Sequence, residues 1–309
     1  MNRFNNVAAL DIGTNSFHLI IASIGDDNKI HILDRKREVL RLSSKNLNGE
    51  TVIKLRQITS AVVLIKKFQR LAKIYNTEIT AVATSAVREA INKNEFLEIV
   101  KKNTGIKVKI IQGKVEAELI YNAVVNYFDE LANQKILCID IGGGSTEFIV
   151  AKKNKIFIAE SLKLGAVRFA KEYFTNPILA KNNISLCELH IEKELKKISE
   201  AVINEKFVEV TGSSGTIQTV RSILKEFYKI NLVEDRITKE DVEMVFDLVM
   251  SKKDIEERLQ IPGLEFKRAD IFPAGILILK KIFDLLELKS MRVSDYALRE
   301  GIIYEMCKK

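Results

Sequence analysis

The sequence predicts an α/β protein built from two duplicated lobes. Residues 10–22 read LDIGTNSFHLIIA and residues 139–151 read IDIGGGSTEFIVA, so that six of thirteen positions are identical and three more exchange one bulky apolar residue for another. A chain of 309 residues is too long for one typical core and suits two domains. A meander of strands followed by alternating helices and strands occurs twice, which indicates duplication rather than one doubly wound sheet.

The first lobe is expected over residues 1–124. Apolar alternation, helical spacing and turn residues predict its elements in order. They are strands at 7–12, 17–24 and 30–34, with a turn at 26–28, then a helix within 49–75, a strand at 78–84, a helix capped by Ser85, a helix at 94–102, a strand at 108–111 and a helix at 114–127.

The second lobe is expected over residues 125–309. Its predicted elements are strands at 135–140, 146–151 and 156–162, helices at 165–174 and 185–204, a strand at 207–211, helices at 213–228, 239–250, 254–260 and 268–287, and a strand at 291–294. Short strand–helix spacing favours parallel pairing after each meander. A final helix within 297–309 is expected to complete the first lobe.

The composition is that of a cytoplasmic protein. Residues 1–6 are polar and lead straight into a strand, so we expect no signal peptide. No apolar run approaches the roughly 20 residues of a membrane span. Three cysteines, Cys138, Cys187 and Cys307, lack metal-ligand spacing and are expected to be reduced. Only three histidines are present, which does not favour a histidine-rich metal site.

The net charge of +8 favours an anionic partner. The basic residues are scattered, and the sequence has no arginine-rich arm, zinc-finger spacing or aromatic stacking motif, so nucleic acid is not favoured. A small or linear phosphate polyanion fits the charge, and so does a surface that is merely basic.

The two repeated turns are candidate phosphate-binding sites. A glycine-rich turn between paired strands aims backbone N–H groups outwards, and such a row of donors binds phosphate oxygens. The candidate residues are Gly13, Thr14, Asn15 and Ser16 in the first turn, and Gly142, Gly143, Gly144 and Ser145 in the second. One Asp-Gly turn alone is usually only a tight turn, whereas two copies with similar flanking strands predict a phosphate site.

Acidic residues beside the turns are candidate ligands of Mg²⁺ or another divalent cation. Asp11 and Asp140 precede the two turns, and Glu147 follows the second. A carboxylate does not bind phosphate directly but can hold Mg²⁺, which bridges to phosphate. His18 occupies in the first copy the position that Glu147 occupies in the second.

The two turns resemble the phosphate-binding motifs of the actin, sugar-kinase and heat-shock-chaperone ATPase superfamily. More closely, the chain resembles the exopolyphosphatase and guanosine pentaphosphate phosphohydrolase family, in its short two-domain form. The supporting segments run in order along almost the whole chain: DIGTNSFH at 11–18, TSAVREA at 84–90, GKVEAELI at 113–120, DIGGGSTE at 140–147, GSSGT at 212–216 and SDYALREG at 294–301.

The resemblance implies two ribonuclease-H-like (actin-like ATPase) lobes with an interlobe cleft. It implies hydrolysis of the terminal phosphoanhydride of inorganic polyphosphate, with release of orthophosphate, or of guanosine pentaphosphate to the tetraphosphate. The family's water-activating glutamate corresponds to Glu116. The sequence departs from the family pattern at Lys114 and Val115, where the family has Asn and Glu, and the effect of this departure is left open.

Further site residues follow from the same resemblance. Arg88 is expected to bind phosphate oxygens through its guanidinium. Arg268 is a candidate for the polyanion path, with a surface charge at a helix N-terminus as the alternative. A second anion site at a helix N-terminus, or an ordinary cap and turn, is expected at Gly212, Ser213, Ser214, Gly215 and Thr216.

Two other functions remain open at this point. An ATP-dependent phosphotransferase or ATPase would use the same turns, because fold does not fix function. A non-catalytic polyphosphate or alarmone sensor would keep the turns as well. Glu116 and the terminal SDYALREG segment favour hydrolysis. The sequence does not rank long polyphosphate, short polyphosphate and guanosine pentaphosphate, and it leaves metal preference and oligomeric state undecided.

Overall fold

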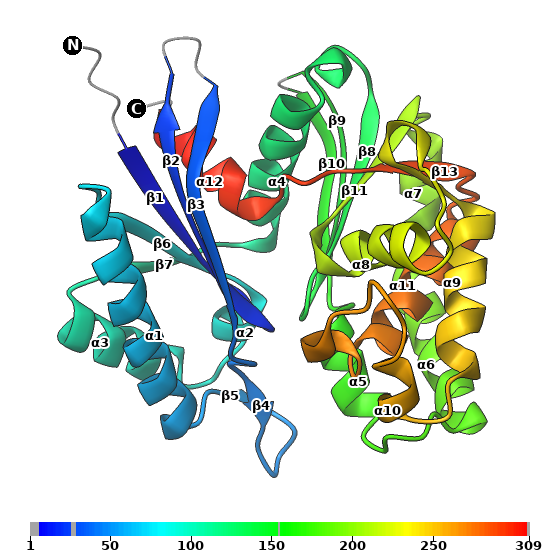
Figure 1. Ribbon diagram of the computed structural model, residues 1–309, viewed down its shortest axis with the longest axis horizontal. Coiled ribbons are helices and arrows are strands. Elements are labelled where there is room, and N and C mark those ends of the chain that lie inside the picture. The colour runs from blue at the N-terminus through cyan, green and yellow to red at the C-terminus, as the bar shows by residue number, and fades with distance from the viewer. Residues whose placement is uncertain (1–5, 26–28, 154, 308–309) are drawn as a thin grey trace. The chain divides into compact units, whose positions relative to one another are not determined.

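The computed structural model describes residues 6–25, 29–153 and 155–307. The chain divides into two compact units (Figure 1). Unit 1 contains the chain up to Ala123 and the segment from Leu298 onward, and unit 2 contains Val124–Ala297. The turn predicted at 26–28 lies outside the described residues.

Unit 1 contains a five-stranded sheet in the order β3–β2–β1–β6–β7. β1, β2 and β3 form an antiparallel meander, and β6 and β7 continue the sheet parallel to β1. The elements are β1 (Asn6–Ile12), β2 (Ser16–Ile24), β3 (Ile30–Val39), α1 (Leu55–Ile74), β6 (Ile79–Ala83), α2 (Ser85–Arg88), α3 (Lys93–Thr104), β7 (Val108–Ile110), α4 (Gly113–Tyr127) and α12 (Leu298–Cys307). α4 carries the chain into unit 2.

The alternation of side chains along β1 places helices against the sheet of unit 1. Ala8, Leu10 and Ile12 lie in one apolar core with the buried face of α1. Ala9 is buried outside that core, and α12 packs against β1 and β2. Gly301 lets α12 approach α4, because a Cβ there would overlap the Leu119 backbone. The C-terminal helix therefore belongs to the first unit by packing, while α1 and α3 lie side by side (Figure 1).

In unit 1 the helix expected within 49–75 is confirmed with a later start, and the expected Ser85 cap is wrong. The chain before α1 forms a small hairpin, β4 (Ser44–Lys45) and β5 (Thr51–Val52), so the helix begins at Leu55 and not near Gly49. Gly49 has a φ of 76°, which breaks a helix but suits a turn. The N-cap of α2 is Thr84 rather than Ser85, whose Oγ instead donates to Glu89 Oε1 at 2.7 Å.

Unit 2 contains a six-stranded sheet in the order β10–β9–β8–β11–β13–β12. β10, β9 and β8 form a meander, β11 and β13 run parallel to β8, and β12 is antiparallel to β13. The elements are β8 (Ile136–Ile141), β9 (Thr146–Lys152), β10 (Lys155–Leu162), α5 (Ala166–Tyr173), α6 (Lys181–Leu195), α7 (Ser199–Asn204), β11 (Glu209–Ser213), α8 (Ser214–Glu226), β12 (Arg236–Thr238), α9 (Lys239–Ser251), α10 (Ile255–Arg258), the 3₁₀ turn η3 (Phe266–Arg268), α11 (Phe272–Leu285) and β13 (Ser290–Val293).

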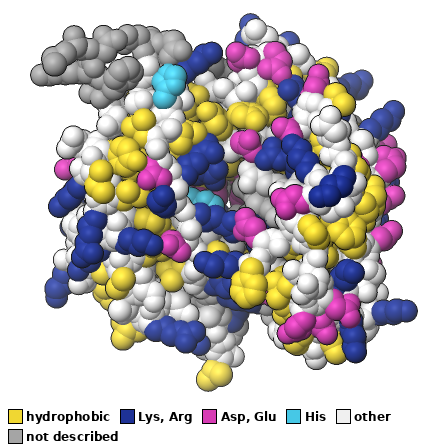
Figure 2. Space-filling view, viewed as in Figure 1, with side chains coloured by type: hydrophobic (Ala, Val, Ile, Leu, Met, Phe, Trp, Pro, Cys, Tyr) yellow, Lys and Arg dark blue, Asp and Glu magenta, His cyan; other side chains and the backbone are white. Residues whose placement is uncertain are grey.

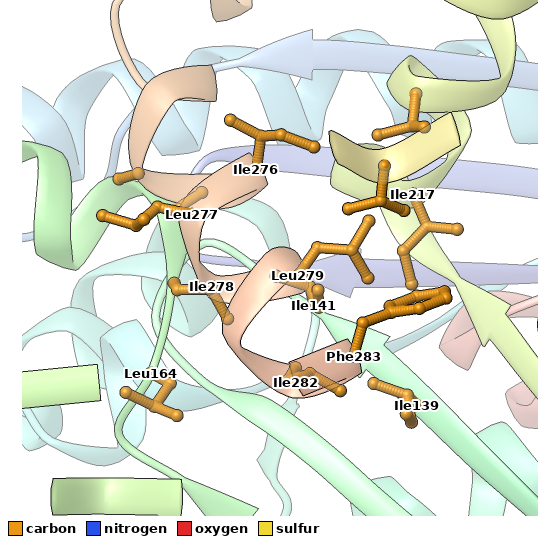
Figure 3. Close-up of a cluster of buried hydrophobic side chains, with 14 of the residues drawn as sticks. Ile139, Ile141, Leu164, Ile217, Ile276, Leu277, Ile278, Leu279, Ile282 and Phe283 are labelled. Carbon is orange, nitrogen blue, oxygen red and sulfur yellow. The ribbon is translucent and has the colours of Figure 1, made fainter. Parts of the chain in front are cut away.

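α11 is the central helix of unit 2 and packs against α5, α6, α8 and α9. Figure 3 shows apolar side chains of this helix, among them Leu279, Ile282 and Phe283, near Ile139 and Ile141 of β8 and Ile217 of α8. Burial of so many apolar side chains is the main stabilising contribution to this unit. None of the described helices combines the length and apolar character needed to cross a lipid bilayer.

Two predictions in unit 2 need correction, and one strand was not predicted. The helix predicted at 185–204 is two helices that meet near Ile198, where the backbone is not helical. Leu195, Ile198 and Val202 are all buried, so the apolar spacing continues across the break and hides it. The helix predicted at 268–287 begins at Phe272 after η3. The three-residue strand β12 was not predicted, because only Ile237 in it is apolar.

Candidate active site

The predicted functional residues of unit 1 gather at the carboxyl ends of its parallel strands. Asp11 is the penultimate residue of β1, Arg88 ends the short helix that follows β6, and Glu116 lies in the first turn of the helix that follows β7. Open α/β sheets bind ligands at this edge, because the connections there leave a crevice lined by loops and helix N-termini.

Arg88 forms an ion pair with the buried Glu116 in unit 1. Arg88 Nη1 donates to Glu116 Oε2 and to the backbone carbonyl of Ile111, each at 2.9 Å. The two side chains are 16% and 8% exposed. A charge-assisted hydrogen bond at low exposure fixes the orientation of the carboxylate more firmly than a surface pair would. Lys114 and Val115, the two departures from the family pattern, are both exposed.

The first turn, Gly13–Ser16, is closed by backbone and side-chain contacts within unit 1. Gly13 N–H donates to Ser16 O at 3.1 Å, while the carbonyl of Asn15 accepts from the amides of Leu40 and Arg41. The Asn15 side chain is 7% exposed, and its Oδ1 and Nδ2 have no hydrogen-bond partner among the described residues. A buried amide without partners costs stability, which is typical of a group kept for a ligand.

The second turn, Gly142–Ser145, is supported by the start of α5. Gly142 N–H donates to Ser145 O at 2.9 Å, and the carbonyls of Gly142 and Gly143 accept amides from the first residues of α5. Gly165 has no room for a side chain, because a Cβ would lie 2.5 Å from Gly143 O. The carbonyls of Gly142 and Gly143 are therefore already hydrogen-bonded. The N–H groups of Gly143 and Gly144 donate to no backbone carbonyl among the described residues and remain available to a ligand.

Asp140 is linked to the turn between β11 and α8. Its Oδ2 accepts hydrogen bonds from Ser213 Oγ and Ser214 Oγ, both at 2.6 Å, and it is 5% exposed. Ser214 has a φ of 70°, a strained value for a residue with a side chain. The two hydroxyl contacts hold this strained residue in place at the first position of α8.

Arg268 lies over Gly215 at the N-terminus of α8. A Cβ added at Gly215 would overlap the Arg268 guanidinium, whose Nε also donates to Glu265 Oε2 at 3.3 Å. The Arg268 side chain is only 12% exposed and lies in η3, so it is not a surface charge at the start of α11. A guanidinium and a helix N-terminus in one place form an electropositive position suited to phosphate.

The neighbouring residues Gly212 and Thr216 have packing roles in unit 2. A Cβ at Gly212 would overlap Met291, and Gly212 is paired within the sheet on both sides. The Thr216 side chain lies against Gly275 of α11. Any phosphate contact by Thr216 would therefore come from its backbone.

The strand register confirms the predicted correspondence of His18 and Glu147. Asp11 lies opposite His18 on β1 and β2, and Asp140 lies opposite Glu147 on β8 and β9. Directly opposite residues of antiparallel strands share one face of the sheet. Unit 2 thus has two carboxylates side by side where unit 1 has a carboxylate and an imidazole.

The carboxylate pair of unit 2 fits a divalent cation. Asp140 and Glu147 are both buried, and Glu147 Oε1 accepts from Ser161 Oγ at 2.7 Å. Two neighbouring buried carboxylates repel one another unless a positive charge compensates them. Mg²⁺ commonly takes one or two carboxylates and completes its shell with water and substrate phosphate.

The predicted metal set is not gathered within one unit, because Asp11 belongs to unit 1 and the other two belong to unit 2. No group of three His, Cys, Asp or Glu side chains suited to a metal is found among the described residues. The three-residue set therefore stays a prediction.

Three residues near the predicted site were missed by the sequence reasoning. Arg168 Nε donates to Gly144 O at 2.8 Å, Ser161 contacts Glu147, and the buried Arg258 donates to Ala269 O directly after η3. An arginine one turn into a helix gives no signal by itself. Arg168 lies two residues after the LGA segment at 164–166, and this position is the only sign of its role in the sequence.

Taken together, two α/β units that each place an Asp-Gly turn at the carboxyl ends of parallel strands have the actin-like ATPase fold. The profile of the Ppx/GppA phosphatase family matches residues 20–309, and the chain belongs to that family. It is a family of phosphatases, and the class of enzyme follows from the membership.

Individual relatives agree over nearly the full length. A Haemophilus influenzae protein named "Putative exopolyphosphatase" is 34% identical over 303 residues, which are 98% of this chain and 91% of that protein. The crystal structure of an exopolyphosphatase from Cytophaga hutchinsonii is similar with a TM-score of 0.88, at 26% identity and 98% coverage of both chains. The Aquifex aeolicus member of the Ppx/GppA family has a TM-score of 0.79 at 27% identity, with 98% of this chain and 97% of that chain covered.

Proposed function

We propose that this protein is a Mg²⁺-dependent exopolyphosphatase, which releases orthophosphate from the end of inorganic polyphosphate. The observation that carries the proposal is the ion pair between Arg88 and the buried Glu116 at the carboxyl edge of the unit 1 sheet. Hydrolysis needs a carboxylate that orients and deprotonates water, and Glu116 is held in place for that role. The names of the Haemophilus influenzae and Cytophaga hutchinsonii relatives support the same activity.

Glu116 acts as general base in this proposal. Its carboxylate takes a proton from the attacking water as the water oxygen bonds to the terminal phosphorus and the bond to the bridging oxygen breaks. The shortened polyphosphate leaves with the bridging oxygen. Arg88 holds Glu116 Oε2 in one position, which keeps the base oriented before the substrate arrives.

The turns of both units bind phosphate oxygens. Asn15 offers its amide in the first turn, and the amides of Gly143 and Gly144 serve in the second. Arg268, beside Gly215, binds a further phosphate of the chain. Mg²⁺, held by Asp140 and Glu147 of unit 2, would neutralise the charge that develops on the phosphate oxygens.

Guanosine pentaphosphate is a second substrate in the proposal. Its 5′ end carries the same terminal phosphoanhydride, so that the same residues would release orthophosphate from it. On the face visible in Figure 2, Lys and Arg side chains are interspersed with Asp and Glu. The mixed charges on this face do not by themselves favour long polyphosphate over guanosine pentaphosphate.

The proposed location is the cytoplasm. All three cysteines are free, although Cys138 and Cys187 are buried in unit 2. Burial raises the pKa of each of these two thiols to about 12, so they stay protonated and unreactive. Free, unreactive thiols suit a reducing compartment.

The test is an orthophosphate-release assay with long polyphosphate, tripolyphosphate, guanosine pentaphosphate and ATP side by side, with and without Mg²⁺. We expect release from polyphosphate that needs Mg²⁺. Release from ATP alone, or transfer of phosphate to a sugar or acid acceptor instead of water, would contradict the proposal and favour the ATPase or phosphotransferase. Tight polyphosphate binding without release would identify a sensor.

A further inference from the structure

Arg258 is a completely buried arginine in unit 2. It ends α10, is 1% exposed, and is among the largest fully buried side chains of the described residues. In the part of the chain that the structure describes, its hydrogen bonds run to backbone carbonyls and not to a carboxylate. Nε donates to Ala269 O at 3.1 Å and Nη2 donates to Pro177 O at 2.9 Å, while Nη1 has no partner.

Such an arrangement is costly for folding. Burial lowers the pKa of the Arg258 guanidinium, against the opposing effect of Asp254, Asp270 and Glu256. A buried charge that is only partly hydrogen-bonded destabilises the folded protein relative to an apolar side chain of similar volume. Stability alone therefore does not explain the presence of arginine here.

The carbonyl that Arg258 holds belongs to the residue after Arg268. The segment at 259–271 leads from α10 to α11 and includes η3. Gly263, with a φ of 88°, packs this segment against α8, since a Cβ there would lie 2.5 Å from Ser222 O. One end of the segment is thus fixed by the contact of Gly263 with α8, and the other end by the hydrogen bond from Arg258 to Ala269.

Arg268 lies between these two fixed points. Arg268 N–H donates to Glu265 O at 2.8 Å, and Ile271 N–H donates to Arg268 O at 3.0 Å, so its backbone belongs to a tight 3₁₀ turn. Its guanidinium lies against Gly215 at the N-terminus of α8. A shift of the Ala269 carbonyl would therefore move the Arg268 guanidinium off Gly215.

We propose that Arg258 is a positioning residue that acts through Arg268. By holding Ala269, it keeps the Arg268 guanidinium over Gly215, in the place where Arg268 binds a phosphate of the substrate. This inference rests on the proposed function, because it assigns Arg258 to polyphosphate binding. It also makes a claim about the protein alone, namely that Arg258 orders the 259–271 segment.

The kinetic test is a double-mutant cycle between Arg258→Met and Arg268→Met with polyphosphate as substrate. We expect Arg258→Met to raise KM about tenfold while kcat changes less than about twofold, because binding common to ground and transition states is lost. In the Arg268→Met background, Arg258→Met should leave KM unchanged. A wild-type KM for Arg258→Met, or KM effects that multiply in the double variant, would overturn the proposal.

Arg236→Met is the matched control. Arg236 is another hydrogen-bonded arginine of unit 2, which donates to both oxygens of Glu209 at 2.9 and 2.7 Å, away from the 259–271 segment. We expect it to lower stability without changing KM. A KM increase equal to that of Arg258→Met would show that general destabilisation raises KM, and would contradict a specific role.

A second variant and a second readout cover the remaining outcomes. If Arg258→Met does not fold, Arg258→Lys takes its place, because lysine keeps the charge and reaches one carbonyl. We expect a smaller increase in KM, which again disappears in the Arg268→Met background. If the wild-type protein releases no phosphate, the proposed function fails, and hydrogen exchange still tests the positioning. Amides at 259–271 should exchange faster in Arg258→Lys while the rest of unit 2 is unchanged, and unchanged exchange there would overturn the proposal.

Discussion

The two Asp-Gly turns have the same backbone closure but different surroundings. In both, the amide of the first glycine donates to the carbonyl of the serine three residues later, at 3.1 Å for Gly13 and 2.9 Å for Gly142. In both, the carbonyls of the turn accept amides from the segment that follows the third strand of the meander, at 40–42 in unit 1 and at 166–168 in unit 2. The duplication therefore extends to the contacts that support each turn.

The two turns differ in the chemical groups that each one offers to a ligand. The first turn carries the buried Asn15 amide, and its aspartate lies opposite His18. The second turn consists of glycines held tightly by α5, and its aspartate lies opposite Glu147. The same supporting frame thus presents side-chain donors in unit 1, and backbone donors with a pair of acids in unit 2. We infer that unit 2 binds the cation and unit 1 supplies the base.

Among the variants that distinguish the two turns, the largest effect is expected from Gly165→Ala. Gly165 has a φ of −152°, so its role is to leave space and not to adopt a special conformation, and an added Cβ would lie 2.5 Å from Gly143 O and from Gly144 N. Because these are backbone atoms, the second turn must move. We expect the free energy of unfolding to fall by about 1–3 kcal/mol and phosphate release to be largely lost, as measured by denaturation and by release assay.

Gly105→Ala is the control for that variant. Gly105 has a φ of 76° with no atom near its would-be Cβ, so alanine there costs about 1–2 kcal/mol by backbone strain alone. Phosphate release should be unaffected. Equal loss of activity in both variants would mean that stability, and not the second turn, limits the reaction.

The next prediction compares the two cross-strand pairs, Asp140–Glu147 in unit 2 and Asp11–His18 in unit 1. Glu147→Gln keeps an oxygen for Ser161 but removes one of the two adjacent charges, and we expect the Mg²⁺ concentration for half-maximal activity to rise at least about tenfold. His18→Gln, at the equivalent position of unit 1, should leave the Mg²⁺ requirement unchanged. A titration in which both variants shift alike would contradict the assignment of the cation to unit 2.

A smaller effect is expected from Asn15→Ala. Because the Asn15 amide has no partner among the described residues, its removal breaks no hydrogen bond of the protein alone. The free energy of unfolding should change by less than about 1 kcal/mol, whereas KM should rise about tenfold through loss of one hydrogen bond to a charged phosphate oxygen. Strong destabilisation with an unchanged KM would identify Asn15 as a structural residue.

The smallest effect is expected from Asp284→Asn, which changes the stability of unit 2 at a position outside both turns. Burial alone would raise the pKa of Asp284, but hydrogen bonds from Lys239 and Lys280 lower it below its ordinary value of 3.8. A depressed pKa stabilises the folded state above the unfolded pKa, and this contribution is lost as pH falls through the folded pKa. Asp284→Asn should therefore lower stability at pH 7 by less than about 1 kcal/mol, with no change in KM.

The pH dependence checks the sign of that contribution. Urea denaturation of Asp284→Asn and wild type should give converging stabilities as the pH is lowered below 3.8. A difference that persists or grows at low pH would show that the Asp284 charge is not what stabilises α11.

The sequence predicts both turns and their register because these are local. An apolar strand, an Asp-Gly turn and a second strand specify the pairing of Asp11 with His18 and of Asp140 with Glu147. Most strands and helices were predicted within a few residues for the same reason. The breaks at Ile198 and before Leu55 were missed, because apolar spacing continues through them.

The contacts that complete the candidate site join distant parts of the chain. Arg268 lies over Gly215, and Ser213 and Ser214 reach Asp140, which is more than 70 residues away in sequence. No periodicity encodes such pairs, because they depend on how α8 and η3 pack in unit 2. Glu116 was identified through the family resemblance, while its partner in the ion pair became evident only in the fold.

Glu116→Gln tests the central claim most directly, with Glu118→Gln on the same helix as the control. The measurement is orthophosphate release from polyphosphate, together with polyphosphate binding by each protein. We predict that Glu116→Gln loses about 10²–10⁴-fold in kcat while binding is retained, and that Glu118→Gln behaves as wild type. Wild-type turnover by Glu116→Gln would contradict the assignment of Glu116 as the base that activates water.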